Sequence, residues 1–118
     1  MSNKNYNRGA NFERKVKKYL ESKKYLVFRS AGSHSVADLI AFPTTSTKMI
    51  DIQIFNTSNP WLIQCKTGSA KMSQKEIDDL YILSYDYGLN PILATINKKK
   101  RLEFFLLTQG RRLYEFSI

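Results

Sequence analysis

Hydrophobic positions in the first part of the chain recur at the spacing of one helix face. The positions of this face are Phe12, Val16, Tyr19, Leu20 and Lys23. This spacing predicts a helix that begins at Arg8, and we expect residues 1–7 before it to form a flexible polar arm. A short β-rich run follows over residues 25–28, and residues 29–35 form a polar loop of small residues.

Short apolar runs bounded by turn-forming residues predict the strands of a sheet. Beyond the first run they cover residues 37–42, 49–55, 61–66, 92–96 and 102–107, and residues 113–118 form either a terminal strand or a tail. A second helix begins with the capping-box pattern of Ser73 and Glu76 and ends at Gly88. This order, without an internal repeat or a low-complexity linker, predicts one α/β domain over residues 1–118 with a mixed sheet flanked by helices.

The length and composition fit a globular protein with its own core. The chain has 118 residues, of which 42% are hydrophobic, and its single cysteine, Cys65, excludes an internal disulfide. No apolar run approaches the roughly 18 residues that cross a membrane, and the N-terminal residues lack the apolar core of a signal peptide. We therefore expect a protein of the cytoplasm.

The charge of the chain points to a polyanionic partner. Nineteen Lys and Arg residues against ten Asp and Glu residues give a formal net charge of +9. Nucleic acid is the obvious polyanion, although a protein that binds membrane surfaces, or a merely soluble cationic protein, would have a similar charge. The predicted helices lack one long basic face, which disfavours the membrane surface.

An acidic residue and a polar-x-lysine sequence lie in neighbouring predicted strands. Asp38 stands among residues that otherwise have the character of a buried strand. Gln64 and Lys66 are two positions apart, so both project from the same face of their strand. Cys65 points the other way, toward the core, and its backbone carbonyl remains available as a ligand. Such oxygen ligands suit a hard cation, and a lysine beside them suits an attacked phosphate.

Each of these residues also has a simpler explanation. Asp38 could be a capped or solvent-facing carboxylate, and Gln64 and Lys66 could lie on the wet face of an edge strand. Glu13 on the first helix could simply pair with Lys17 one turn later. The combination of the residues, rather than any one of them, favours a metal-binding site.

Four segments with distinctive residues follow one another at short spacings. They are residues 8–14 (RGANFER), 29–33 (RSAGS), 38–40 (DLI) and 64–66 (QCK). Together they resemble the archaeal Holliday junction resolvases, including forms carried by archaeal viruses, which belong to the PD-(D/E)xK nuclease superfamily. The resemblance implies a restriction-endonuclease-like fold, an α/β arrangement with a central mixed five-stranded sheet flanked by helices. It also implies a homodimer that cuts two opposed strands of a four-way DNA junction symmetrically.

The resemblance assigns a role to each matching position. Glu13 matches the glutamate of the family's first helix, which supports the metal or its water, and Asp38 matches the principal metal-ligating aspartate. Lys66 matches the active-site lysine, which steadies the scissile phosphate and the nucleophilic water. Ser33 matches a loop serine that approaches the substrate backbone. The residues expected to contact DNA, by resemblance or by charge, are Arg8, Arg14, Arg29, Ser30, Ser35 and Lys71.

One position departs from the family pattern. Where the family has a glutamate two residues before the lysine, this chain has Gln64, which can ligate through its carbonyl oxygen but has no negative charge. We expect Gln64 and the backbone carbonyl of Cys65 to join Glu13 and Asp38 as ligands of Mg²⁺, with Mn²⁺ as a possible substitute. Because the site has two carboxylates where three are expected, we predict weaker divalent binding and a higher metal requirement.

Other features leave their alternatives open. His34 and the basic turn at residues 97–101 could contact phosphate or could simply be solvated. The runs at residues 92–96 and 102–107 hold more apolar surface than a one-faced sheet needs, and this surplus could form a dimer interface. The expected function is a Mg²⁺-dependent, junction-resolving endonuclease. The alternatives are a non-catalytic protein that binds branched DNA and a nuclease of the same superfamily that acts on linear duplex.

Overall fold

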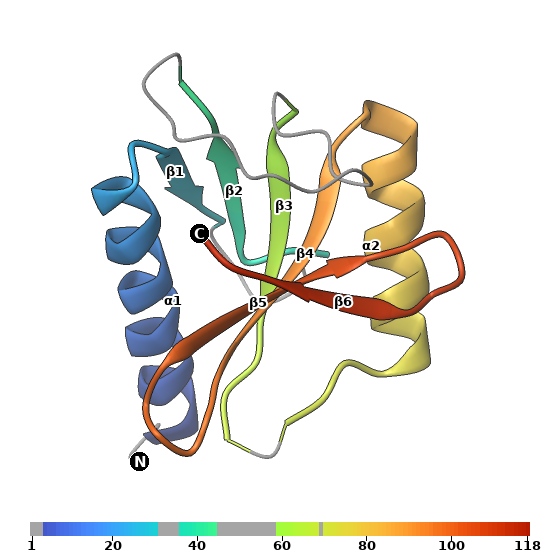
Figure 1. Cartoon of the computed structure of the whole chain (residues 1–118). Coiled ribbons are helices and arrows are strands. Elements are labelled where there is room, and N and C mark those ends of the chain that lie inside the picture. The colour runs from blue at the N-terminus through green and yellow to red at the C-terminus, as the bar shows by residue number, and fades with distance from the viewer. Residues whose placement is uncertain (1–3, 31–35, 45–58, 69) are drawn as a thin grey trace.

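The computed structural model describes residues 4–30, 36–44, 59–68 and 70–118. These residues form two helices and six strands (Figure 1). In chain order they are α1 (Lys4–Ser22), β1 (Leu26–Arg29), β2 (Leu39–Phe42), β3 (Trp61–Cys65), α2 (Gln74–Tyr87), β4 (Asn90–Ile96), β5 (Leu102–Leu107) and β6 (Leu113–Phe116). The strand predicted at residues 49–55 lies outside the described residues.

The six described strands lie in one sheet, in the order β1-β2-β3-β4-β5-β6. β3 and β4 run parallel and are joined through α2, whereas the other neighbouring strands are antiparallel. A parallel pair needs such a crossover, because a tight turn cannot bring the chain back to the start of the sheet. The predicted mixed α/β sheet is confirmed. The described part has six strands rather than five, and its last strand, β6, is the predicted terminal run paired with β5.

The two helices cover opposite faces of the sheet, as Figure 1 shows. Successive side chains of a strand point to alternate faces, so each strand can contribute to both layers. On the α1 side, Val16 and Leu20 are fully buried in a cluster that includes Trp61. On the α2 side, Leu80 belongs to a second cluster with Leu62. Because the neighbours Trp61 and Leu62 enter different clusters, β3 is covered by protein on both faces.

Both predicted helices are present, with one change at the N-terminal boundary. α1 begins at Lys4 rather than Arg8, so residues 4–7 belong to the helix and not to the expected arm. These positions are polar and carry no hydrophobic periodicity, which was the signal used to predict the helix. α2 has the predicted capping box, in which the Ser73 hydroxyl accepts the Glu76 N–H and the Glu76 carboxylate accepts the Ser73 N–H.

The apolar surplus of β4 and β5 is used inside the protein. Ile92 and Phe104 are buried in the cluster under α1. Leu107 is buried in the cluster under α2, and Leu93 is only 7% exposed. The two helices of the same chain therefore cover these apolar residues, for which a dimer interface was the hypothesis.

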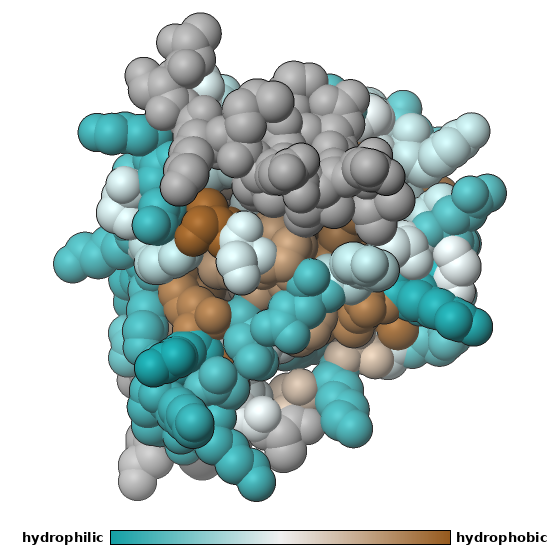
Figure 2. Space-filling model, in the orientation of Figure 1, coloured by the Kyte–Doolittle hydropathy of each residue, from teal (hydrophilic) through white to brown (hydrophobic). Residues whose placement is uncertain are grey.

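The outer surface of α1 is largely hydrophilic. Figure 2 shows hydrophilic side chains over the α1 side of the view and hydrophobic ones nearer its middle. Arg14, Lys15 and Lys18 are among the exposed positions of this helix, opposite its buried face. Within the described ranges, no helix combines the length and the apolar character needed to span a membrane.

Candidate active site

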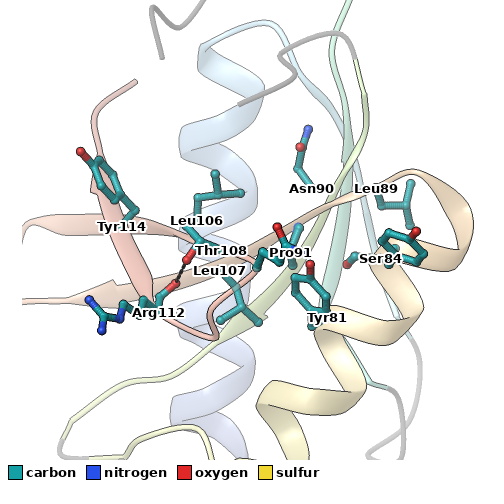
Figure 3. Close-up of a pocket in the computed structure, with 12 residues that line it drawn as sticks. Tyr81, Ser84, Leu89, Asn90, Pro91, Leu106, Leu107, Thr108, Arg112 and Tyr114 are labelled. Carbon is teal, nitrogen blue, oxygen red and sulfur yellow. Dashed lines mark hydrogen bonds between the residues drawn. The ribbon is translucent and has the colours of Figure 1, made fainter. Parts of the chain in front are cut away.

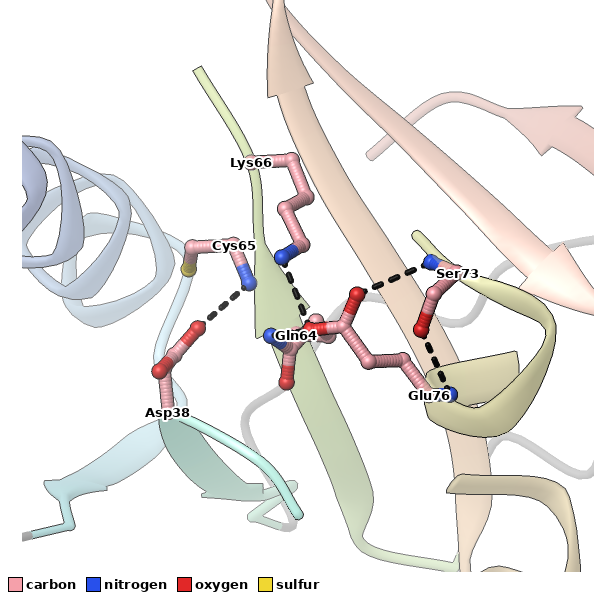
Figure 4. A network of polar contacts seen from close by, with 6 residues as sticks. All are labelled: Asp38, Gln64, Cys65, Lys66, Ser73 and Glu76. Carbon is pink, nitrogen blue, oxygen red and sulfur yellow. Dashed lines mark hydrogen bonds and ion pairs between the residues drawn. The ribbon is translucent and has the colours of Figure 1, made fainter. Parts of the chain in front are cut away.

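Asp38 and the end of β3 come together at one end of the sheet. Because β2 and β3 are antiparallel, the start of β2 lies beside the end of β3. Asp38 directly precedes β2, and its N–H donates to the carbonyl of Ile63 at 2.8 Å. Its Oδ2 accepts a hydrogen bond from the Cys65 N–H, also at 2.8 Å. Figure 4 shows Asp38 beside Cys65, and Gln64 and Lys66 are the residues before and after Cys65 in the chain. The acidic residue and the Gln-x-Lys sequence predicted for the site therefore lie next to each other.

The carboxylate of Asp38 is partly buried among charged neighbours. Burial raises the pKa of Asp38 above its ordinary value, and the negative charges of Glu13 and Glu76 add to the rise. The hydrogen bond from the Cys65 N–H and the positive charge of Lys66 oppose it without cancelling it. A carboxylate in such surroundings is stabilised by a nearby cation. Asp38 is therefore more than a solvent-facing carboxylate at a strand end.

Gln64 lies on a central strand, Lys66 directly follows that strand, and the two share one contact. β2 and β4 flank β3 on both sides, so the alternative that these residues lie on an edge strand is wrong. Gln64 is only 8% exposed, and its Nε2 donates to Oε2 of Glu76 at 3.4 Å. The Nζ of Lys66 lies 2.8 Å from the same oxygen. The buried Oε1 of Gln64 has no hydrogen-bond partner among the described residues.

Cys65 faces the other side of the sheet, as predicted. Its side chain packs against the cluster under α1. Burial raises the pKa of the Cys65 thiol well above its ordinary value, and the charges of Asp38 and Glu13 raise it further. Since the thiolate is the form that binds metals and attacks substrates, the protonated thiol does neither at neutral pH. The backbone carbonyl is therefore the group that Cys65 can offer to a metal.

Glu13 reaches the site from α1 and is held by Arg29. Its Oε1 lies 2.7 Å from the Nε of Arg29, and its side chain is 19% exposed. The simpler pairing within the helix is not the one observed, because Lys17 pairs with Glu21 at 2.8 Å. The charge of Glu13 acts on Asp38, so the two carboxylates share one electrostatic environment. Arg29 pairs with Glu13 in this structure, and its expected contact with DNA stays a prediction.

The other residues expected to contact DNA have varied surroundings. The Ser30 hydroxyl donates to the carbonyl of Ala37 at 2.9 Å, which ties together the two ends of the intervening loop. Arg8 and Lys71 are exposed, and Arg14 is exposed with a hydrogen bond to a neighbour on α1. Residues 31–35 of the predicted loop lie outside the described part, and with them the candidates Ser33, His34 and Ser35.

Glu76 is a candidate site residue that the sequence did not reveal. The capping-box pattern already explained its presence, and nothing in the pattern pointed to a second contact. Its carboxylate lies against both Gln64 and Lys66 (Figure 4). The sequence held only an indirect signal for this role of Glu76. The strand has a glutamine where a glutamate is expected and so lacks one negative charge, and Glu76, ten positions after Lys66, is an acidic residue that could supply it.

The groups that face this site suit a hard divalent cation. The candidate donors are a carboxylate of Asp38, the Oε1 of Gln64 and the carbonyl of Cys65, all of them oxygens. The buried Oε1 of Gln64 fits this purpose, because a buried oxygen without a partner is costly and a cation would satisfy it. Among the described residues, no group of three or more His, Cys, Asp and Glu side chains is already gathered around a metal position. The donor set therefore mixes carboxylate, amide and carbonyl oxygens.

The sheet topology, with an acid and a lysine meeting at its end, defines a class of protein: the α/β proteins of restriction-endonuclease-like fold. Within this class, the model of the family described as archaeal Holliday junction resolvase (Hjc) matches residues 4–113. The chain belongs to this family of archaeal Holliday junction resolvases.

A relative similar in sequence agrees with this assignment, and a solved structure shares the fold. A crossover junction endodeoxyribonuclease Hjc from Methanocaldococcus jannaschii is 33% identical over 112 residues, covering 90% of this chain and 74% of the relative. The structure of Hjc from Archaeoglobus fulgidus, a Holliday junction resolvase from an archaeal hyperthermophile, matches with a TM-score of 0.63 at 18% identity. That match covers 93% of this chain and 84% of the other, and it confirms the fold.

Proposed function

We propose that this junction-resolving endonuclease hydrolyses phosphodiesters in two opposed strands of a four-way DNA junction, with the help of Mg²⁺. The endonuclease activity on junctions follows from the family, whereas the residues, the metal and the paired cutting are proposals. The observation that supports them most is the meeting of Asp38 with the Gln-x-Lys end of β3. The enzyme would act in the cytoplasm of an archaeal cell, or of one infected by an archaeal virus.

Oxygens of three residues would hold the metal. They are the carboxylate of Asp38, the Oε1 of Gln64 and the carbonyl of Cys65, and Glu13 would support the metal or its water. Mg²⁺ favours such ligands, and Mn²⁺ could replace it. A bound divalent cation polarises a phosphoryl oxygen and lowers the pKa of an attacking water. The partly buried Asp38 carboxylate, with its raised pKa, is suited to receive a positive charge.

Lys66 would face the scissile phosphate. Its side chain is 20% exposed and is held at 2.8 Å by Glu76, so its position is set before DNA arrives. A positioned ammonium stabilises the negative charge that develops on a phosphate during hydrolysis. Arg29 holds the Glu13 carboxylate in a similar way, at 2.7 Å. We propose that Ser33 approaches the substrate backbone from its loop.

The positive charge of the protein would supply affinity for DNA. The formal net charge is +9, and cationic side chains release counterions when they contact phosphates. We propose that Arg8, Arg14, Lys71, Ser30 and Ser35 make such backbone contacts. Phosphate contacts position a protein without reading sequence, which suits an enzyme selected by the shape of a branch.

We propose that two copies of the chain pair, so that two active sites meet opposed strands. A groove between α2 and the end of the sheet offers a contact surface (Figure 3). Its apolar and aromatic lining includes Tyr81, Tyr85, Leu89, Leu106, Leu107 and Tyr114. Tyr85 is 78% exposed and Tyr114 is 58% exposed, and exposed apolar area of this kind marks interaction surfaces. The proposed interface therefore centres on α2 and β6, and only the start of β4 and the end of β5 contribute to the groove between them.

A comparison of two substrates tests this function against its alternatives. A labelled four-way junction and a linear duplex of the same arm sequence are incubated with the protein in Mg²⁺ or in EDTA. We expect paired symmetric nicks, confined to the junction and seen only with metal. Cutting of both substrates would instead favour a general nuclease, and tight junction binding without cutting would favour a non-catalytic binding protein.

A further inference from the structure

Glu76 directs one oxygen of its carboxylate at two polar side chains, that of Gln64 on β3 and that of Lys66 directly after β3. Its Oε2 lies 2.8 Å from the Nζ of Lys66 and 3.4 Å from the Nε2 of Gln64. Its other oxygen, Oε1, accepts the Ser73 N–H at 2.9 Å. Figure 4 shows this carboxylate between the start of α2 and β3. One oxygen therefore completes the helix cap, and the other faces the candidate active site.

Helix capping explains only half of this arrangement. A capping box needs the glutamate to accept the N–H of the N-cap residue, which Oε1 already does. It does not need the contacts of Oε2 with Gln64 and Lys66 on a neighbouring strand. Lys66 is 20% exposed, and an ammonium withdrawn from water needs an anion nearby. Gln64, being neutral, cannot supply that anion, whereas Glu76 does.

Gln64 gives an independent sign that a ligand belongs here. It is 8% exposed, and its buried Oε1 has no hydrogen-bond partner among the described residues. The orientation of its amide follows from Glu76, because the reverse orientation would set two oxygens against each other. The carbonyl oxygen is therefore turned away from the Glu76 carboxylate and is available to a cation.

The charges at this end of the sheet explain why Glu76 matters. The carboxylates of Glu13, Asp38 and Glu76 lie near the cations Arg29 and Lys66, which leaves a formal charge of −1. Without Glu76 that formal charge would be zero, and a divalent cation would have to enter a neutral site. The Oε2 of Glu76 contacts Gln64 and Lys66, the two chain neighbours of Cys65, and the Cys65 N–H donates to Asp38, so the charge of Glu76 lies close to the carboxylate proposed to bind the metal.

We propose that Glu76 is a third acidic residue of the active site, which supplies from α2 the negative charge that Gln64 cannot supply from β3. It thereby strengthens the binding of a divalent cation and holds Lys66 in place. This role rests on the proposed function, since it assumes that the Asp38 site binds a metal. It also implies that the loss of metal affinity expected from Gln64 is partly offset.

Metal affinity of the protein without DNA tests this role independently of cleavage. Calorimetric titration with MnCl₂ compares the wild type with Glu76→Gln, which keeps the shape and an acceptor for the Ser73 N–H but removes the charge. We expect this variant to bind Mn²⁺ about ten- to a hundredfold more weakly, the usual effect of losing a supporting residue of a metal site. Adding Gln64→Glu to the same chain should restore most of the affinity that Glu76→Gln removes.

Two controls separate charge at the site from other effects. Asp79→Asn removes an equal charge from the same helix, where Asp79 pairs with Lys75 at the surface. Ser73→Ala weakens the helix cap but keeps the carboxylate of Glu76. Both should bind Mn²⁺ as the wild type does, and thermal melts monitored by circular dichroism verify that every variant is folded. Unchanged affinity in Glu76→Gln, equal loss in a control, or no rescue by Gln64→Glu would overturn the role.

Metal binding and junction cleavage are measured separately, so failure of the nuclease proposal can be told apart from failure of the role of Glu76. A wild-type protein that binds Mn²⁺ through Glu76 yet leaves junctions uncut would refute the nuclease proposal and support the role of Glu76. If both hold, Glu76→Gln should cut junctions slowly at low Mn²⁺ and recover toward the wild-type rate as Mn²⁺ is raised. A cleavage rate that does not rise as Mn²⁺ is raised would overturn the metal-binding part of this role, whereas a deficit that remains at saturating Mn²⁺ is the expected effect of losing the anion that holds Lys66.

Discussion

The carboxylate of Asp38 is costly to the folded protein as long as no metal cation is bound beside it. Burial raises its pKa above the ordinary value of 3.8. The unfolded chain therefore loses this proton at lower pH than the folded chain does, and the stability decreases as the pH rises from 3.8 through the higher folded value. At neutral pH the full cost is present. A bound cation would remove it, so metal binding and stability are linked at this residue.

We predict that Asp38→Asn stabilises the protein without metal and abolishes cleavage. The neutral amide has a smaller desolvation cost than the ionised carboxylate and can still accept the Cys65 N–H through its oxygen. At pH 7 and without metal, the melting temperature of Asp38→Asn should be higher than that of the wild type. The two melting temperatures should converge as the pH falls toward 3.8, because the wild-type carboxyl is then protonated. Mg²⁺ should raise the melting temperature of the wild type only. A variant that melts below the wild type at pH 7 and still responds to Mg²⁺ would contradict this account.

Residues that meet through the sheet were easier to predict than residues that meet through a helix. Gln64 and Lys66 share a face because strand geometry repeats every second residue, and the sequence shows that spacing. The contact of Lys66 with Glu76 depends on how α2 docks after β3, which no local pattern encodes. The pairing of Glu13 with Arg29 likewise joins α1 to β1 across 16 positions and has no sequence signature.

At the scale of elements, the candidate active-site residues and a basic turn lie at the same end of the sheet. β4 runs parallel to β3, and Cys65 pairs with Ala94, so the turn after β4 leaves the sheet at the end that holds Lys66. The side chain of Asn97 shapes this turn by accepting the N–H groups of Lys99 and Arg101. The turn is therefore an ordered basic element near the candidate active site, which favours DNA contact over simple solvation.

We predict that the basic turn binds phosphates of the DNA. The double variant Lys98→Ala/Lys99→Ala should weaken junction binding and reduce the slope of log affinity against log salt by roughly one for each phosphate that the protein no longer neutralises. Lys23→Ala is the control, because Lys23 lies between α1 and the start of β1. The start of β1 pairs with the last residue of β2, whereas Asp38 precedes the first, so Lys23 lies at the end of the sheet away from the candidate active site. Titrations of a labelled junction by fluorescence anisotropy at several salt concentrations would measure both. An unchanged slope in the double variant would show that the turn is only solvated.

Two features of the fold could not be predicted from the sequence: the first residue of α1, and what covers the apolar residues of β4 and β5. The start of α1 at Lys4 was missed because polar residues can extend a helix without contributing to its buried face. The apolar residues of β4 and β5 were identified correctly, but a sequence cannot show whether a second face is covered by the same chain or by a partner. α2 covers it here, with Leu80 and Leu107 in one cluster.

For the whole molecule, the proposed pairing of two copies would convert a single nuclease site into a resolvase. Two opposed cuts need two active sites, and the described chain contributes one. Its exposed large hydrophobic side chains fall in two regions: one on β1, with Leu26 and Phe28, and one on α2 and β6, with Ile82, Tyr85 and Tyr114. The second region borders the groove of Figure 3, which makes it the better candidate for the interface.

We predict that Tyr85→Lys separates the copies into monomers. Tyr85 is 78% exposed, so the change should spare the core, and a lysine near the end of α2 is favourable because that last turn has no basic residue. Light scattering after gel filtration should show a dimer for the wild type and a monomer for the variant. Leu26→Lys, at a position 53% exposed on β1, is the control and should remain dimeric. A monomer produced by Leu26→Lys instead would move the interface to β1.

Cleavage of a supercoiled plasmid that extrudes a cruciform tests the central claim most directly. Two cuts made across one junction before the protein leaves convert the plasmid to the linear form, whereas independent single cuts give nicked circles. We predict that the wild type with Mg²⁺ yields linear plasmid, and that Asp38→Asn yields neither product while still binding a synthetic junction. Linear plasmid from Asp38→Asn, or equal nicking of a plasmid without the cruciform, would contradict the account.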